Sequence, residues 1–168
     1  MDTEVLVVGG AAAGLSIASC LQKGGVSCIV LEKFPKCGDM WRSRYHRLHL
    51  HDIKRECHLP HLDMPSDYPT YPTRLQFASY LDSYAEQLKI PVKQHHKVIS
   101  AVFDESASVW TVSAEDTSTK ATTLRKFKCK HLIIANGIYN DPRIPKFTNQ
   151  EQYQGLVSFS ITSMYSNI

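Results

Sequence analysis

The sequence has little that would tie it to a nucleic acid, a membrane or an oxidising compartment. Its net charge is only +3 and its basic residues are scattered, which argues against a nucleic-acid partner. Outside the opening stretch there is no long apolar segment, so no membrane attachment is evident. The five cysteines are odd in number and form no C-x-x-C pair, a pattern typical of structural thiols in a reducing compartment. We therefore expect a cytoplasmic protein.

The opening stretch, VLVVGGAAAGL, is apolar and carries no charged side chain until Lys23. A signal peptide would have positive charge before its apolar core, whereas Asp2 and Glu4 precede this one. A membrane helix would need about 20 apolar residues, and the adjacent glycines Gly9 and Gly10 would interrupt it. The remaining explanation is a strand, a glycine turn and a helix.

Residues 5–8 are apolar and mostly β-branched, and they end at glycine, as a short buried strand does. Small residues over 11–21 suit a helix packed closely on a sheet, and Gly24 ends that helix. A second buried strand is predicted over 26–31, VSCIVL. A strand, a helix and a strand in this order form a βαβ unit, which predicts a parallel sheet.

The turn between the first strand and the helix predicts a dinucleotide site. Unpaired N–H groups at a helix amino terminus favour phosphate oxygens, and glycine lets the backbone approach a pyrophosphate. In the fingerprint G-x-G-x-x-G, Ala11 replaces the middle glycine, and Glu32 is the acid expected on the ribose. An acid here favours FAD or NAD over NADP. The candidate phosphate-binding residues are Gly9, Gly10, Ala11, Ala13 and Gly14.

The rest of the chain predicts a mixed α/β fold with a single core, since 168 residues are too few for two full domains. An irregular connection over 33–62 is too long for a plain loop. Thr73 is a plausible N-cap for a helix over 74–89. Strand-like runs follow at 98–103, 109–114, 124–129 and 131–135. The expected fold is a parallel-sheet, FAD/NAD(P)-binding, Rossmann-like domain with a three-stranded antiparallel β-meander.

The motifs GGAAAG, LEK, CGDMW, YHRLHLH, DYPTYPT, IIANG and PRIP, in this order, resemble the flavin-containing monooxygenases. They are most similar to the plant-type indole-pyruvate branch, over nearly the whole chain from Glu4 to about Asn167. The resemblance implies that the glycine turn and Glu32 bind FAD, that the G-x-x-W segment lies along its adenosine side, and that IIANG closes on the flavin. It adds these candidate cofactor-binding residues: Lys33, Gly38, Trp41, Arg42, His51, Val98, Ala135 and Gly137.

The resemblance also implies an activity. Such an enzyme uses NADPH to reduce FAD and then O2 to form a flavin hydroperoxide, which oxygenates a small nucleophilic or keto-acid substrate. An ungapped alignment over 45–69 places His51 opposite the flavin, where it would hydrogen-bond the peroxide or bound NADP. His51 is therefore the candidate catalytic residue. The expected partners are a small-molecule substrate and O2, with no nucleic acid and no membrane; a homo-oligomer stays open.

Two departures from the family limit this expectation. The sequence has no second G-x-G-x-x-[GS] turn to hold NADPH. The family's F-x-G-x-x-x-H-x-x-x-[YF] signature should fall at 153–165, where Gly155 and Tyr165 match but no histidine occurs. We expect residues 1–168 to form an incomplete FAD-binding domain without its NADPH-binding half. The chain would then be an amino-terminal fragment, a truncated isoform or a degenerate copy, inactive alone, and would need NADPH only in a full-length form.

Three alternatives stay open. A truncated chain could bind FAD without catalysis, or the one glycine turn could serve an NAD-dependent oxidoreductase with a single site. A zinc site is the third alternative, but the spacing fits no structural zinc pattern well and we expect no metal. Its candidate ligands would be His46, His49, His51, Cys57, His58 and His61.

Overall fold

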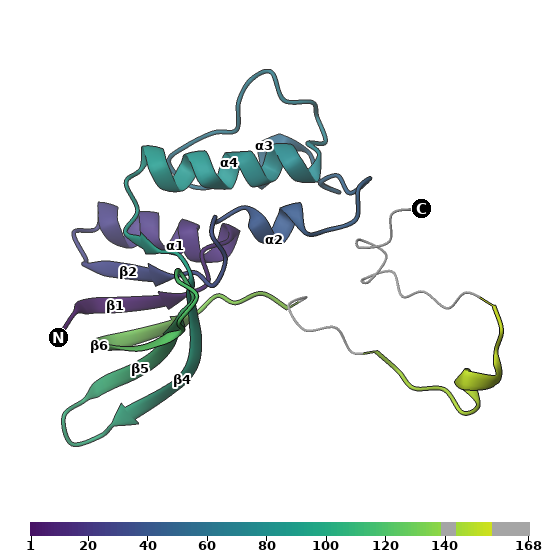
Figure 1. The fold of residues 1–168 in the computed structure, drawn as a ribbon. Helices are drawn as coiled ribbons and strands as arrows, with labels where there is room; N and C mark the ends of the chain where they lie inside the picture. The colour runs from purple at the N-terminus through teal and green to yellow at the C-terminus, as the bar shows by residue number, and fades with distance from the viewer. Residues whose placement is uncertain (139–143, 156–168) are drawn as a thin grey trace.

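The computed structural model of this chain describes residues 1–138 and 144–155. Its centre is a six-stranded sheet in the order β3-β2-β1-β6-β5-β4 (Figure 1). The strands are β1 Thr3–Val8, β2 Cys28–Leu31, β3 Val92–Lys93, β4 His96–Asp104, β5 Val109–Asp116 and β6 Thr123–Ile134. The helices are α1 Ala12–Lys23, α2 Asp39–Arg42, α3 Lys54–Cys57 and α4 Arg74–Gln87, with a 3-10 turn, η1, at Gln150–Gln152.

The expected βαβ unit is confirmed. Strand β1 pairs in parallel with β2 and with β6, and β2 pairs in parallel with β3, while α1 connects β1 to β2. Alternate residues of β1 enter different cores: Val5 and Val7 pack with α1 and α4, whereas Leu6 packs with the meander strands. Burial on both faces explains why the strand has a continuous apolar sequence.

Strand β6 corrects one prediction. Two separate strands were expected at 124–129 and 131–135, but the structure forms one strand over Thr123–Ile134. Its first part pairs antiparallel with β5 up to Cys129, and its last part pairs in parallel with β1 from Cys129, beside Thr3, to Ile134. Lys130 carries no turn signal, so the backbone continues from one set of partners to the other. The three-stranded meander is therefore an extension of the parallel sheet.

Helix α4 begins where the sequence predicts. The Thr73 hydroxyl accepts a hydrogen bond from the Gln76 backbone N–H, and the Gln76 side chain accepts one from the Thr73 N–H, which makes a capping box. In Figure 1, α4 lies on the far side of α1 from the strands. The irregular connection before it contains only the one-turn helices α2 and α3.

Two further findings concern membrane-spanning helices and the end of the described chain. Within 1–138 and 144–155, no helix is long and apolar enough to cross a membrane. From residue 156 onward, the signature expected at 153–165, with its match at Tyr165, lies outside the described residues.

Candidate functional site

The glycine turn links the end of β1 to the start of α1. Gly9 has a φ of 104°, a left-handed conformation that favours glycine, and its N–H donates to the Leu31 carbonyl at 2.8 Å. A Cβ added there would lie 2.4 Å from the Ala135 carbonyl oxygen, so the end of β6 also requires glycine at this position. The turn is thus closed by backbone from β2 and β6, the two neighbours of β1.

Helix α1 begins against this turn without a side-chain cap. Its N-cap residue is Ala11, and its first turn contains no acidic residue. A Cβ on Gly14 would lie 1.9 Å from the Gly9 carbonyl oxygen, so only glycine lets the helix approach so closely. Neither the N-cap side chain nor an acidic side chain of the first turn therefore competes for the first N–H groups of α1. This is the local chemistry that suits a phosphate.

Glu32, directly after β2, lies at the same turn. One carboxylate oxygen accepts a hydrogen bond from the Gly10 N–H at 2.6 Å, and the other accepts one from the Phe34 N–H at 2.8 Å. Burial raises the pKa of Glu32, against the opposing effects of these N–H groups and of the Lys33 charge. The Lys33 ammonium lies 4.8 Å from the centre of the Phe34 ring. The acid and the glycine turn, separate in sequence, thus form one site.

The G-x-x-W segment is fixed to α4. A Cβ on Gly38 would lie 2.2 Å from the Ala78 carbonyl oxygen, so this contact needs glycine. Trp41 packs edge to face on Phe77 with ring centres 4.7 Å apart. Because both contacts are with α4, the helix sets the position of the whole segment.

Asp82 on α4 completes this attachment, and sequence reasoning missed it. Its carboxylate accepts a hydrogen bond from the Gly38 N–H at 2.9 Å and forms an ion pair with Arg42 at 2.6 Å. Arg42 also pairs with Asp39 at 3.0 Å. No local motif marks Asp82, because its partners lie about forty residues earlier in the chain.

The remaining predicted site residues lie in three different places. Ala135 donates its N–H to the Val8 carbonyl at 2.8 Å, and Gly137 follows with a φ of 77°, so both lie where β6 leaves the sheet beside the glycine turn. Val98 lies near the start of β4, partly buried against the core that β1 and β2 share with the meander. His51 is exposed, in a bend of the long connection, where the preceding N–H of Leu50 donates to the Pro72 carbonyl.

The histidine cluster does not gather around one point. Across the described part of the chain, no group of three or more His, Cys, Asp or Glu side chains is arranged to hold a metal ion. His58 instead pairs with Asp63 at 3.2 Å, and His61 lies 3.8 Å from the Cys20 sulfur. The structure therefore offers no geometry for the zinc alternative among these side chains.

Replacing Asp82 tests whether α4 positions the G-x-x-W segment. Asp82→Asn removes the charge that pairs with Arg42, and we expect a loss of about 1 kcal/mol of stability, since the pair is partly exposed. We also expect FAD affinity to fall by roughly fivefold to tenfold, about 1 kcal/mol or slightly more. Flavin fluorescence titration and urea unfolding measure the two effects. Glu86→Gln, on an exposed position of the same helix, is the control; equal FAD affinity in both variants would exclude a positioning role.

The geometry of the site identifies the class of protein, and the comparison with known sequences identifies the family. A parallel sheet with a glycine turn that opens a helix, beside a buried acid after the next strand, is the arrangement of FAD- and NAD(P)-binding Rossmann-like folds. A sequence profile described as pyridine nucleotide-disulphide oxidoreductase matches residues 6–166. The chain belongs to this family.

Curated relatives and solved structures confirm the resemblance to flavin monooxygenases. The chain is 35% identical over 152 residues to indole-3-pyruvate monooxygenase YUCCA6 of Arabidopsis thaliana, a match that covers 90% of this chain and 36% of the relative. A flavin monooxygenase from Stenotrophomonas maltophilia superposes with a TM-score of 0.82 at 26% identity, over 96% of this chain and 46% of that one.

The fold is shared more widely. The bacillithiol disulfide reductase Bdr of Bacillus cereus superposes with a TM-score of 0.79 at 18% identity, over 90% of this chain and 44% of that one. This likeness concerns the fold alone. The chain spans about a third of the length of the curated relatives that it matches.

Proposed function

We propose that residues 1–168 are the FAD-binding portion of an NADPH-dependent flavin monooxygenase that oxygenates a small organic substrate through a flavin hydroperoxide. The observation that carries the proposal is the uncapped amino terminus of α1, which lies against the turn where the buried carboxylate of Glu32 contacts Gly10. Together they provide donors for a diphosphate and acceptors for the ribose of its adenosine.

FAD, when bound, supplies the redox chemistry that the side chains lack. The first N–H groups of α1 would bind the diphosphate, since the N–H groups of Gly9 and Gly10 already donate to Leu31 and Glu32. Each oxygen of Glu32 accepts one backbone N–H and can accept a second donor, so the ribose hydroxyls could bind without breaking these contacts. His51 would donate a hydrogen bond on the flavin side, and its exposed bend leaves the imidazole accessible.

The family name includes disulfide chemistry, and the cysteine next to the G-x-x-W segment is poorly suited to it. All five cysteines are free thiols. The buried Cys37 precedes the G-x-x-W segment, and burial, together with the charges of Glu32 and Asp82, raises its pKa to about 12. A thiol with that pKa is not ionised at neutral pH and is a poor nucleophile. Cys37 is therefore a poor candidate for disulfide exchange at the flavin site.

FAD titration tests the proposal directly. We expect the purified chain to bind one FAD with quenching of flavin fluorescence, and to bind NAD at least tenfold more weakly. NADPH oxidation in the presence of O2 should be absent for this chain alone, which has no second glycine turn. Preferential binding of NAD would favour the single-site NAD-dependent oxidoreductase. FAD binding without NADPH oxidation agrees both with the proposal and with a non-catalytic isoform, and NADPH oxidation by a longer form would separate them.

A further inference from the structure

Strand β4 is the outer strand of the meander, and one of its two edges has no neighbour among the described strands. The strand order ends at β4, which pairs within the described sheet only with β5. Strand β4 has nine residues and no proline, whereas β3, the outer strand at the opposite end, has two residues and follows Pro91. Short length and proline protect an exposed edge from pairing with another chain. The free edge of β4 has neither protection.

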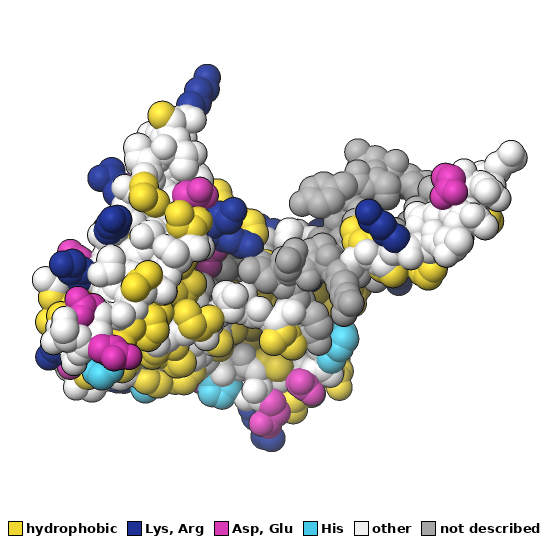
Figure 2. Space-filling model, turned by 90° about the horizontal axis from the view of Figure 1, so that it is seen from below, with side chains coloured by type: hydrophobic (Ala, Val, Ile, Leu, Met, Phe, Trp, Pro, Cys, Tyr) yellow, Lys and Arg dark blue, Asp and Glu magenta, His cyan; other side chains and the backbone are white. Residues whose placement is uncertain are grey.

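Apolar side chains are exposed along β4. Ile99 is 49% exposed, Val102 64% and Phe103 43%. Figure 2 shows the molecule from below, the side on which β4 and β5 lie in Figure 1, and hydrophobic side chains are grouped over it. An apolar patch beside an unpaired strand edge indicates a surface that another β-strand covers.

A β-bulge determines which residues of β4 share a face. The register with β5 shifts between Val98 and Ser100, so Ile99 is an extra residue. Side chains alternate between the two faces of a regular strand, and Lys97 and Asp104, an odd number of positions apart, would lie on opposite faces. The extra residue brings them to the same face, since the β5 residues opposite them are an even number of positions apart.

A second copy of β4 fits the free edge with its charges matched. In a two-fold symmetric pair the two copies run antiparallel, and the residue at the axis lies opposite itself. With the axis at Ala101, each Lys97 lies opposite Asp104 of the other copy. A lysine on an exposed edge normally discourages pairing, but this one gains a partner of opposite charge. The two ion pairs also fix the register, because a shift in either direction would separate them.

The turn after β4 holds Asp104 in position for this contact. Its Oδ1 atom accepts hydrogen bonds from the Ser106 hydroxyl at 2.6 Å and from the Ala107 N–H at 3.1 Å. These bonds, that of the Ser106 side chain above all, lower the pKa of Asp104, so its carboxylate is charged at neutral pH. Both bonds use Oδ1, and Oδ2 can therefore accept the Lys97 ammonium of the second copy.

The same axis pairs apolar side chains on both faces of the strand. On the face toward the core, each Val98 lies opposite Phe103 of the other copy. On the other face, each Val102 lies opposite the bulge residues Ile99 and Ser100, in the same two-to-one arrangement that the bulge makes with β5. The exposed apolar side chains of β4 are therefore covered in the pair.

We propose that the chain forms a two-fold symmetric dimer through the free edge of β4, in which the two sheets join into one. The partner is a second copy of this chain, selected by the match of Lys97 to Asp104. One strand pair is a small interface, so the dimer is weak, with a dissociation constant on the order of 10 µM. Dimerisation through this edge goes beyond the proposed function and requires no cofactor.

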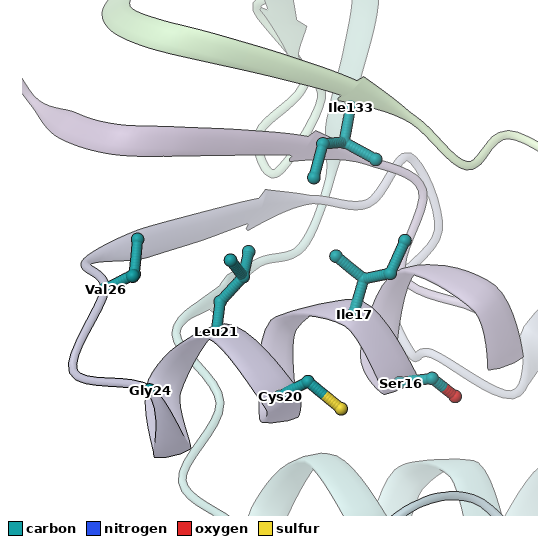
Figure 3. A pocket seen from close by; sticks show the side chains of 7 residues that line it. All are labelled: Ser16, Ile17, Cys20, Leu21, Gly24, Val26 and Ile133. Atoms are coloured by element: carbon teal, nitrogen blue, oxygen red, sulfur yellow. The ribbon is translucent and has the colours of Figure 1, made fainter.

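A hollow beside α1 is another apolar surface, but its shape does not suit a two-fold contact. Its volume is about 490 Å³, and Figure 3 shows Ile17 and Leu21 of α1, with Val26, pointing toward Ile133 across it. A two-fold contact brings the same surface of both copies together. A concave surface does not fill a second concave surface, whereas a strand edge pairs with its own copy.

Charge reversal tests the match of Lys97 to Asp104. Sedimentation velocity over a concentration series, without FAD, should show the wild-type chain pass from monomer to dimer, whatever the outcome of FAD titration. Lys97→Glu brings acids face to face and Asp104→Lys brings lysines face to face, so each variant alone should dimerise more weakly by roughly tenfold or more. An equimolar mixture of the two variants restores both ion pairs and should dimerise like the wild type.

The matched control is Ile17→Lys, which adds a charge to the hollow beside α1 and should dimerise like the wild type. Circular dichroism checks that each variant is folded, because Asp104→Lys also removes the bonds to Ser106 and Ala107. Hydrogen exchange of the wild type needs no substitution. Where the dimer predominates, alternate amides of residues 98–103 should exchange about fivefold more slowly than in the monomer, while the amides of β3 should not change.

Four results would overturn the proposal. The wild-type chain stays monomeric at concentrations well above the expected dissociation constant, or Lys97→Glu dimerises as strongly as the wild type. The mixture of the two folded variants fails to dimerise, or the dimer forms without slower exchange along β4. Dissociation by Ile17→Lys would also overturn it, because the interface would then lie at the hollow beside α1.

Discussion

Gly14→Ala is expected to lower FAD affinity by about a hundredfold or more and to destabilise the fold by about 3 kcal/mol. The added Cβ would lie 1.9 Å from the Gly9 carbonyl oxygen, a distance that no pair of non-bonded atoms tolerates. Because the backbone fixes the position of the Cβ and the oxygen belongs to the main chain, no side-chain rotation relieves the contact. Helix α1 would have to move away from the turn, and its first N–H groups would lose their position around a diphosphate.

The control for this experiment lies at the other end of the same helix. Gly24 has a φ of −78°, and a Cβ there would meet its nearest neighbour, the Leu21 carbonyl oxygen, at 3.4 Å. Gly24→Ala should therefore bind FAD like the wild type and stay within about 0.5 kcal/mol of its stability. Flavin fluorescence and urea unfolding measure both variants. If Gly14→Ala bound FAD as tightly as Gly24→Ala, the diphosphate would not lie at this turn.

Glu32→Gln is expected to weaken FAD binding by about tenfold to a hundredfold, since hydrogen bonds to a charged group contribute about 1.5–3 kcal/mol. The two carboxylate oxygens of Glu32 accept from the Gly10 and Phe34 N–H groups. An amide has one oxygen, so the NH2 group of glutamine would oppose one of these donors. Isothermal titration with FAD measures the effect, and Glu86→Gln again serves as an exposed control.

The same substitution should change how stability depends on pH. Burial raises the pKa of Glu32 above its ordinary value of 4.5, so the folded state favours the protonated carboxyl. The stabilisation from this group is fully present below pH 4.5 and is lost as the pH rises through the pKa of the folded state. Glutamine cannot ionise. The free energy of unfolding of the FAD-free wild type, minus that of Glu32→Gln, should therefore fall as the pH rises above 4.5. A rising difference would contradict burial as the dominant cause.

The sequence predicted those features that depend mainly on interactions between residues close together in the chain. The β-branched run before Gly9 and the small residues after it specify the strand, turn and helix. Thr73 and Gln76 specify the start of α4 through a contact three residues apart. The meeting of Glu32 with the glycine turn was also predictable, because adjacent parallel strands bring their carboxyl ends together.

The missed features depend on partners that are distant in sequence. Strand β6 is continuous because β5 and β1 pair with successive parts of it. The residues of β6 do not show which strands will pair with them. Asp82 resembles any acid on an amphipathic helix until folding brings the Gly38 N–H to it.

The shared strand also couples two regions that would otherwise denature separately. Breaking the pairing of β6 with β5 would loosen its backbone, which continues into the Ala135 carbonyl packed against Gly9. The meander and the glycine turn should thus melt in one cooperative transition. The hairpin of β4 and β5 therefore stabilises the glycine turn indirectly, through the backbone of β6.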